Sequence, residues 1–120
     1  MKFNPDLMTF AGNWKMNGRH DDRPDIESLI KLISEDDANI ILFPPYTLIS
    51  SFVDISKNSN LNIGGQDCHH EDSGAFTGSV SASMLRDSGA DFVIIGHSEV
   101  RAIQGKGPDN IINKIQSAHV

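Results

Sequence analysis

The sequence predicts an α/β fold made of parallel βα units, and two observations carry this prediction. Short apolar runs alternate along the 120 residues with longer segments whose apolar residues recur at helical spacing. The runs at residues 40–43 and 92–95 are apolar at every position. Strands of this kind are buried on both faces, which is typical of a parallel sheet covered by helices. A chain of this length is expected to form a single domain, here residues 1–120.

The predicted elements follow one another in the order βαβαβαβα. We expect strands at residues 7–11, 38–43, 61–65 and 91–95, and helices at 25–34, 47–57, 81–88 and 109–119. Pro24 suits the first turn of the first helix, whose apolar face is formed by Ile26, Leu29, Ile30 and Ile33. Ser81 is the expected N-cap of the third helix, and Gly89 is expected just beyond its end.

Three architectures accept this order of elements. They are a small doubly wound sheet, half of a dinucleotide-binding fold, and part of an eight-stranded barrel. In all three, functional side chains lie at the carboxyl ends of the strands, which directs attention to the loops that follow them. No glycine-rich nucleotide or phosphate motif follows any strand, so the dinucleotide fold is disfavoured and we expect no cofactor.

Composition and charge exclude several classes of partner. The chain carries 16 acidic and 10 basic residues, a net charge of −6, and the basic residues are not clustered, so we expect no nucleic-acid partner. The longest apolar runs are far shorter than a membrane span, and Asn, Pro and Asp within the first six residues disfavour a signal peptide. Cys68 is the single cysteine, so no internal disulfide can form. Together these features predict a cytoplasmic protein without a membrane partner.

Polar side chains follow the first and the fourth predicted strands. After the first strand, Asn13 and Lys15 could present an amide and an ammonium to one anion, or could belong to an ordinary surface turn. After the fourth strand, the amide groups of a short helix would favour a neutral His97 that donates a hydrogen bond to a carbonyl oxygen. The alternative is a partly buried histidine with a structural role. Glu99 is either an ion-pair partner of Lys15 or a residue that compensates the helix dipole.

The third strand leads into a long polar connection at residues 64–78. Connections of this length are usually functional. The run from Cys68 to Asp72 contains residue types that bind metals, but no second ligand pair follows at zinc-like spacing, so we expect a solvated loop and no metal. Phe76 lies between glycines at the tip. It either inserts into another surface or folds back on its own chain.

These loops resemble those of the triosephosphate isomerase family. Residues 12–17 (Gly-Asn-Trp-Lys-Met-Asn), 74–78 (Gly-Ala-Phe-Thr-Gly) and 96–99 (Gly-His-Ser-Glu) resemble the family's first, third and fourth βα loops, in the same order. Residues 64–68 and 88–90 add to the likeness. The resemblance implies the N-terminal half of a (β/α)8 barrel, whose full length is about 250 residues. It also implies a homodimer that acts on a small phosphorylated triose.

The resemblance also implies a role for each candidate residue. His97 would polarise the substrate carbonyl and stabilise the enediolate. Lys15 would place positive charge beside the same oxygen and the phosphate, and Asn13 would hold the substrate. Glu99 would pair with Lys15 and contribute to the proton network. Thr77 would reach into the neighbouring subunit as a dimer contact.

The sequence also departs from the family. No segment resembles the family's glutamate base, lid or phosphate-gripping loops, which follow strands six to eight, so we expect the isolated chain to be inactive and to need a C-terminal half. Val100 stands where the family usually has Arg, Ser79 where it has an acidic residue, and Lys106 where it has Glu. The alternatives are an inactive truncated or split gene product that self-associates or needs a C-terminal partner, and a flavodoxin-like phosphate-binding module.

Overall fold

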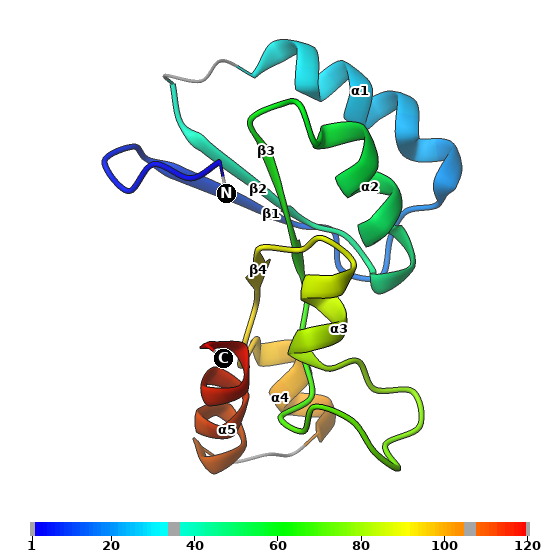
Figure 1. The fold of residues 1–120 in the computed structure, drawn as a ribbon, viewed down its shortest axis with the longest axis vertical. Helices are drawn as coiled ribbons and strands as arrows, with labels where there is room; N and C mark the ends of the chain where they lie inside the picture. Colours follow the sequence, from blue (N-terminus) through cyan, green and yellow to red (C-terminus); the bar gives the residue numbers. More distant parts are fainter. Residues whose placement is uncertain (1, 34–36, 105–107, 120) are drawn as a thin grey trace.

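The computed structural model describes residues 2–33, 37–104 and 108–119, and within them a four-stranded parallel sheet with helices between the strands (Figure 1). The strands are β1 (Thr9–Asn13), β2 (Asn39–Phe43), β3 (Leu61–Gly65) and β4 (Phe92–Val93). The helices are α1 (Arg23–Leu32), α2 (Ile49–Ser56), α3 (Ala82–Asp87), α4 (Ser98–Gln104) and α5 (Pro108–His119). Two short 3-10 helices, η1 (His20–Asp22) and η2 (Tyr46–Leu48), precede α1 and α2.

The predicted elements occur in the predicted order; α4 and the two 3-10 helices are additional to them, and the other differences lie at element ends. The third strand has the predicted bounds, whereas β1 begins and ends two residues later than expected. The reason is pairing: Gly12 and Asn13 still match Leu42 and Phe43 of β2, so the ladder continues to the end of its partner. The fourth strand is shorter than expected, because only Phe92 and Val93 pair with β3.

The strands lie in the order β1-β2-β3-β4, and the first three helices bury their apolar residues on one face of the sheet. One cluster joins Ile26 of α1, Phe52 of α2 and Leu85 of α3 to outward-facing residues of the strands, among them Leu42, Leu61 and Ile63. Sequential strands with all three helices on one face are the arrangement of a barrel. The flavodoxin-like alternative, which needs helices on both faces, is therefore wrong.

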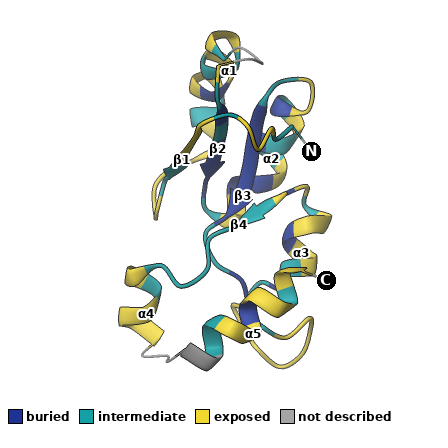
Figure 2. Ribbon diagram, turned by 90° about the vertical axis from the view of Figure 1, so that its left-hand side faces the viewer, coloured by how far each residue is buried: buried dark blue, intermediate teal, exposed yellow. Residues whose placement is uncertain are grey.

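Burial is concentrated in the middle of the sheet. Figure 2 shows β2 and β3 largely buried, whereas α4 and α5 are largely exposed. β1 and β4 are the two edges of the sheet. On β1, Phe10 is 56% exposed although it faces the same side as the buried cluster. No helix in the described ranges is long and apolar enough to cross a membrane.

Both predicted ends of α3 are confirmed. The Ser81 hydroxyl accepts a hydrogen bond from the amide of Met84, which is the N-cap contact. After the helix, Gly89 has a φ of +98°, and the amides of Gly89 and Ala90 donate to the carbonyls of Arg86 and Leu85. This is a Schellman motif, which needs a left-handed residue at the position of Gly89.

Gly89→Ala is expected to destabilise the chain more than Gly78→Ala. Both glycines have positive φ, which costs another residue about 1–2 kcal/mol. A Cβ at Gly89 would also lie 2.5 Å from a methyl group of Val53, whereas a Cβ at Gly78 meets nothing within 4 Å. We therefore expect a loss of more than about 2 kcal/mol for Gly89→Ala in urea unfolding, and a smaller loss for the control. Equal losses would show that the contact with Val53 is unimportant.

Candidate active site

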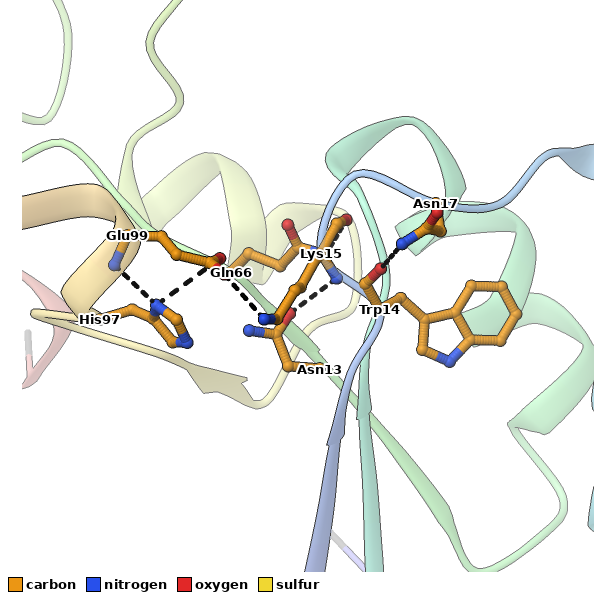
Figure 3. A network of polar contacts seen from close by, with 7 residues as sticks. All are labelled: Asn13, Trp14, Lys15, Asn17, Gln66, His97 and Glu99. Atoms are coloured by element: carbon orange, nitrogen blue, oxygen red, sulfur yellow. Dashed lines mark hydrogen bonds and ion pairs between the residues drawn. The ribbon is translucent and has the colours of Figure 1, made fainter. Parts of the chain in front are cut away.

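The predicted site residues that follow β1 and β4 lie together at the carboxyl end of the sheet. Figure 3 shows Asn13, Lys15, His97 and Glu99 in one polar network, which also contains Gln66 from the end of β3. These residues come from three separate loops. The parallel arrangement places all three loops at the same edge, which is where functional groups of barrel folds are found.

The loop after β1 has an unusual backbone held by side-chain amides. Lys15 has a φ of +56°, in the left-handed region that only glycine adopts freely. The Asn13 side chain accepts a hydrogen bond from the Lys15 amide at 2.8 Å, and the Asn17 side chain donates to the Trp14 carbonyl at 2.8 Å. The Trp14 ring packs edge-on against Phe52, with the ring centroids 5.3 Å apart. The loop therefore rests on the core and turns the Lys15 side chain toward the fourth strand's loop.

The Lys15 ammonium donates to the Glu99 carboxylate at 2.7 Å. Adjacent strands are about 4.8 Å apart, so β1 and β4 would be about 14 Å apart in a flat sheet. A direct contact between their loops therefore reflects the curl of the sheet toward a barrel. The hydrogen bond from Lys15 is the main cause that lowers the pKa of Glu99 below its ordinary value. Both side chains are about half exposed, 54% and 53%, so water and salt screen the pair.

His97 is held by the first turn of α4. The amide of Glu99 donates to Nδ1 of His97 at 3.1 Å. A nitrogen that accepts a hydrogen bond carries no proton, so the geometry fits a neutral imidazole with its proton on Nε2. A Glu99 carboxylate oxygen also lies 3.8 Å from Nδ1, but the amide contact is shorter and defines the tautomer. Nε2–H is then a hydrogen-bond donor for a ligand at the carboxyl end of the sheet.

Gln66 is a site residue to which the sequence analysis assigned no role. Its side-chain amide donates to the carbonyls of Lys15, at 2.7 Å, and Phe43, at 2.8 Å. Two hydrogen bonds contribute about 2 kcal/mol, which is comparable to the cost of a left-handed lysine. The signal that could have found Gln66 is its position as the first residue after β3. The rule that selected Asn13 and His97 applies to it equally.

A second polar cluster, also missed from the sequence, ties α5 to the end of β3. Lys114 is 4% exposed, and its ammonium contacts the Asp67 carboxylate at 2.8 Å and the Gln104 side chain at 3.3 Å. The Tyr46 hydroxyl donates to the Asp67 carbonyl at 2.7 Å. Burial, with the nearby Asp67 charge, raises the pKa of Tyr46 above its ordinary value, so this hydroxyl keeps its proton. The ion pair of Asp67 and Lys114 therefore joins α5 to the end of β3, two elements that no short-range sequence pattern connects.

The connection after β3 is exposed at its tip and anchored at its base. Thr77 and Ser79 are exposed, and Phe76 folds back onto His69 with the ring centroids 4.1 Å apart. Cys68 is buried in the core, and burial raises the pKa of its thiol. In the described part of the chain, no three His, Cys, Asp or Glu residues are grouped so that they could hold a metal ion.

The three departures from the family lie near this end of the molecule or outside the described residues. Val100 is partly buried on α4, and Ser79 is in the exposed connection. Neither side chain carries a charge, so the ion pair expected in the family cannot form between these positions. Lys106 lies outside the described residues.

Lys15→Met is expected to raise the pKa of Glu99 toward its ordinary value, because Lys15 provides the largest lowering effect. In the folded chain the lowered pKa means that Glu99 favours folding above the carboxyl group's ordinary pKa. This contribution is lost as the pH falls through the folded value. NMR titration of the Glu99 side-chain carboxyl carbon measures the change. Lys57→Met, a substitution of an exposed lysine on another face, should leave it unchanged. An unchanged titration in Lys15→Met would contradict the ion pair.

Comparison with known proteins identifies the family. A family model described as triosephosphate isomerase matches residues 8–120. The triosephosphate isomerase of Ruegeria sp. (strain TM1040) is 46% identical over 108 residues, which are 90% of this chain and 43% of the relative. That of Moorella thermoacetica is 40% identical over 110 residues, 91% of this chain and 44% of the relative.

The fold agrees with this comparison. The crystal structure of triosephosphate isomerase from Bartonella henselae superposes with a TM-score of 0.87 at 38% identity, over 93% of this chain and 46% of that one. The chain thus spans less than half the length of the relatives it matches, and its four strands correspond to the N-terminal half of a (β/α)8 barrel. The sequence match, the fold and the order of the polar loops agree, and the chain belongs to the triosephosphate isomerase family.

Proposed function

We propose that this chain supplies the carbonyl-polarising half of a triosephosphate isomerase site, and that polypeptide outside these 120 residues supplies the base. The observation that carries the proposal is the network in which Lys15, His97 and Glu99 meet across the curled sheet. The reaction interconverts dihydroxyacetone phosphate and glyceraldehyde 3-phosphate through an enediolate. In this reaction the chain supplies the groups that polarise the substrate carbonyl.

The geometry suits stabilisation of negative charge on the substrate oxygen. With the Glu99 amide on Nδ1, His97 directs Nε2–H at the carbonyl, and a hydrogen bond there strengthens as the oxygen becomes an enediolate. Triosephosphate isomerase is itself the standard example of a neutral histidine in this role. Lys15 adds a positive charge beside the same oxygen and the phosphate, and Asn13 holds the loop that presents it.

The base must come from elsewhere. Proton abstraction needs a carboxylate or imidazole within hydrogen-bond reach of the substrate C–H. In the network of Figure 3 the carboxylate is Glu99, which is bound to the Lys15 ammonium. The relatives are more than twice as long as this chain, so their further βα units are the source that best fits. The free edges of β1 and β4 and the exposed Phe10 would be covered by the same units.

Completion of the barrel tests this proposal. The chain is joined in frame to the remaining C-terminal part of the Ruegeria isomerase and assayed for isomerase turnover. We expect turnover from the completed barrel and none from the chain alone. His97→Gln should reduce turnover about 100-fold or more, because it removes the imidazole from the carbonyl. His20→Gln, on the exposed η1 turn, is the matched control and should not change the rate.

Two outcomes would contradict the proposal. If the isolated chain turned over at the rate of the completed barrel, the base would lie within these residues. If His97→Gln retained full activity in the completed barrel, His97 would not be the electrophile.

A homodimer is the proposed assembly of the completed barrel. Residues 71–79 are exposed, and Thr77 at the tip is free to contact another surface, as the family resemblance implies. Ser79 and Val100 provide no ion pair between subunits, so contacts of the tip itself would have to hold the dimer. A dimer contact at the tip would explain why this exposed loop has a defined backbone, with positive φ at Gly74 and Gly78.

Thr77→Arg in the completed barrel is expected to shift the dimer toward monomer, because a large charged side chain at the tip cannot enter a neighbouring site. Light scattering measures the mass. Lys57→Arg, at the C-cap of α2, is the control. A wild-type completed barrel that is monomeric at micromolar concentration would overturn the proposed dimer.

A further inference from the structure

Gln66 connects the loop after β1 to the end of β2. The backbone of the loop bonds to the sheet from the Trp14 amide to the Phe43 carbonyl at 3.0 Å. The Gln66 side-chain amide donates to that same carbonyl and to the carbonyl of Lys15. The two protons of one amide group are thus shared between β2 and the left-handed residue of the loop, and Figure 3 shows the bond to Lys15.

Among the described residues, the other side chains that hydrogen-bond to the backbone of this loop are Asn13 and Asn17, which belong to the loop itself. Asn13 and Asn17 bond to the backbone of residues two and three positions away. Such local bonds define a turn, but they move with it and do not fix its place relative to the rest of the sheet. Gln66 is 51 residues from Lys15 in the sequence and lies at the end of β3, between the loop and the strand that leads to His97. Its bonds, together with the packing of Trp14 on Phe52, therefore hold the turn in place.

We propose that Gln66 is a positioning residue for Lys15: by holding the left-handed lysine backbone against the end of β2, it aims the ammonium at Glu99 and at the anion site. The inference rests on the proposed isomerase function as far as the anion is concerned. The geometric part, the coupling from Gln66 through Lys15 to Glu99, stands on the contacts alone. Both parts predict that Gln66 acts only through Lys15.

The role needs two hydrogen-bond donors on a side chain of this length. Both acceptors are backbone carbonyls, so a carboxylate at this position would face them with acceptors only. Methionine has a similar length and shape but no donor, which makes Gln66→Met the informative substitution. Gln116 on α5 is exposed, which makes Gln116→Met the matched control.

The titration of Glu99 reports the position of the Lys15 ammonium. We expect the pKa of Glu99 in Gln66→Met to move toward its ordinary value, as in Lys15→Met, and to stay unchanged in Gln116→Met. In the double variant Gln66→Met/Lys15→Met, the shift should equal that of Lys15→Met alone, because the residue through which Gln66 acts is gone. An unchanged Glu99 titration in a folded Gln66→Met variant, or a further shift in the double variant, would overturn the inference.

A measurement on the unmodified chain keeps the inference testable if Gln66→Met does not fold. Both side-chain amide protons of Gln66 are engaged, whereas those of Gln116 are in an exposed side chain. Solvent exchange of the Gln66 side-chain protons, followed by NMR, should be at least about tenfold slower than that of Gln116. Equal exchange rates would show that the two bonds do not persist and would contradict the proposal.

The completed barrel provides the functional measurement. We expect Gln66→Met to raise KM for the triose phosphate about tenfold, with a smaller fall in kcat, because a displaced ammonium weakens binding of the anion. A variant whose only defect is a smaller folded fraction would show a lower kcat at unchanged KM. That pattern would overturn the proposal that Gln66 aims the Lys15 ammonium at the anion site. A completed barrel with no turnover would contradict the proposed function instead, and the Glu99 titration would then decide the inference by itself.

Discussion

Burial of the outer face of β2 and β3 is the interaction on which the rest of this structure depends. Phe52 is fully buried, and Ile26, Leu48, Ile49 and Leu61 are 1% exposed, in one cluster that joins helices to strands. Burying a side chain of this size contributes about 1.5–3 kcal/mol, and the cluster holds several such side chains. Helices connect each strand to its neighbour, so the strands run parallel and their carboxyl ends meet at one edge.

Because the carboxyl ends of the strands meet at that edge, the loops that follow them form a polar network there. Loops from β1, β3 and β4 bring an ammonium, an amide and an imidazole together, although Lys15 and Glu99 are 84 residues apart in the sequence. The left-handed backbone of Lys15 shows that this placement has an energetic cost. Hydrogen bonds from Asn13 and Gln66 offset that cost locally, and the apolar cluster beneath supports the loop through Trp14.

The same architecture explains why the site is one-sided. Lys15 and His97, which we propose polarise a carbonyl, follow β1 and β4, and among the described residues these two edge strands have no further strand beside them. Relatives more than twice as long provide the additional βα units that would close such a sheet. The two halves of a barrel carry different site residues, since each strand contributes only the residues at its own end.

Local patterns were sufficient for the order of the elements and for the ends of α3. Helical spacing located α1, and the capping residues Ser81 and Gly89 defined α3, because these signals depend on neighbours a few residues away. The motifs in the loops likewise identified the family, and they named Asn13, Lys15, His97 and Glu99. By contrast, the shift of β1, the role of Gln66 and the buried pair of Asp67 and Lys114 were not predictable from these patterns. Each depends on which strands are neighbours and how the sheet curls, and these long-range contacts form only when the whole cluster of helices and strands packs.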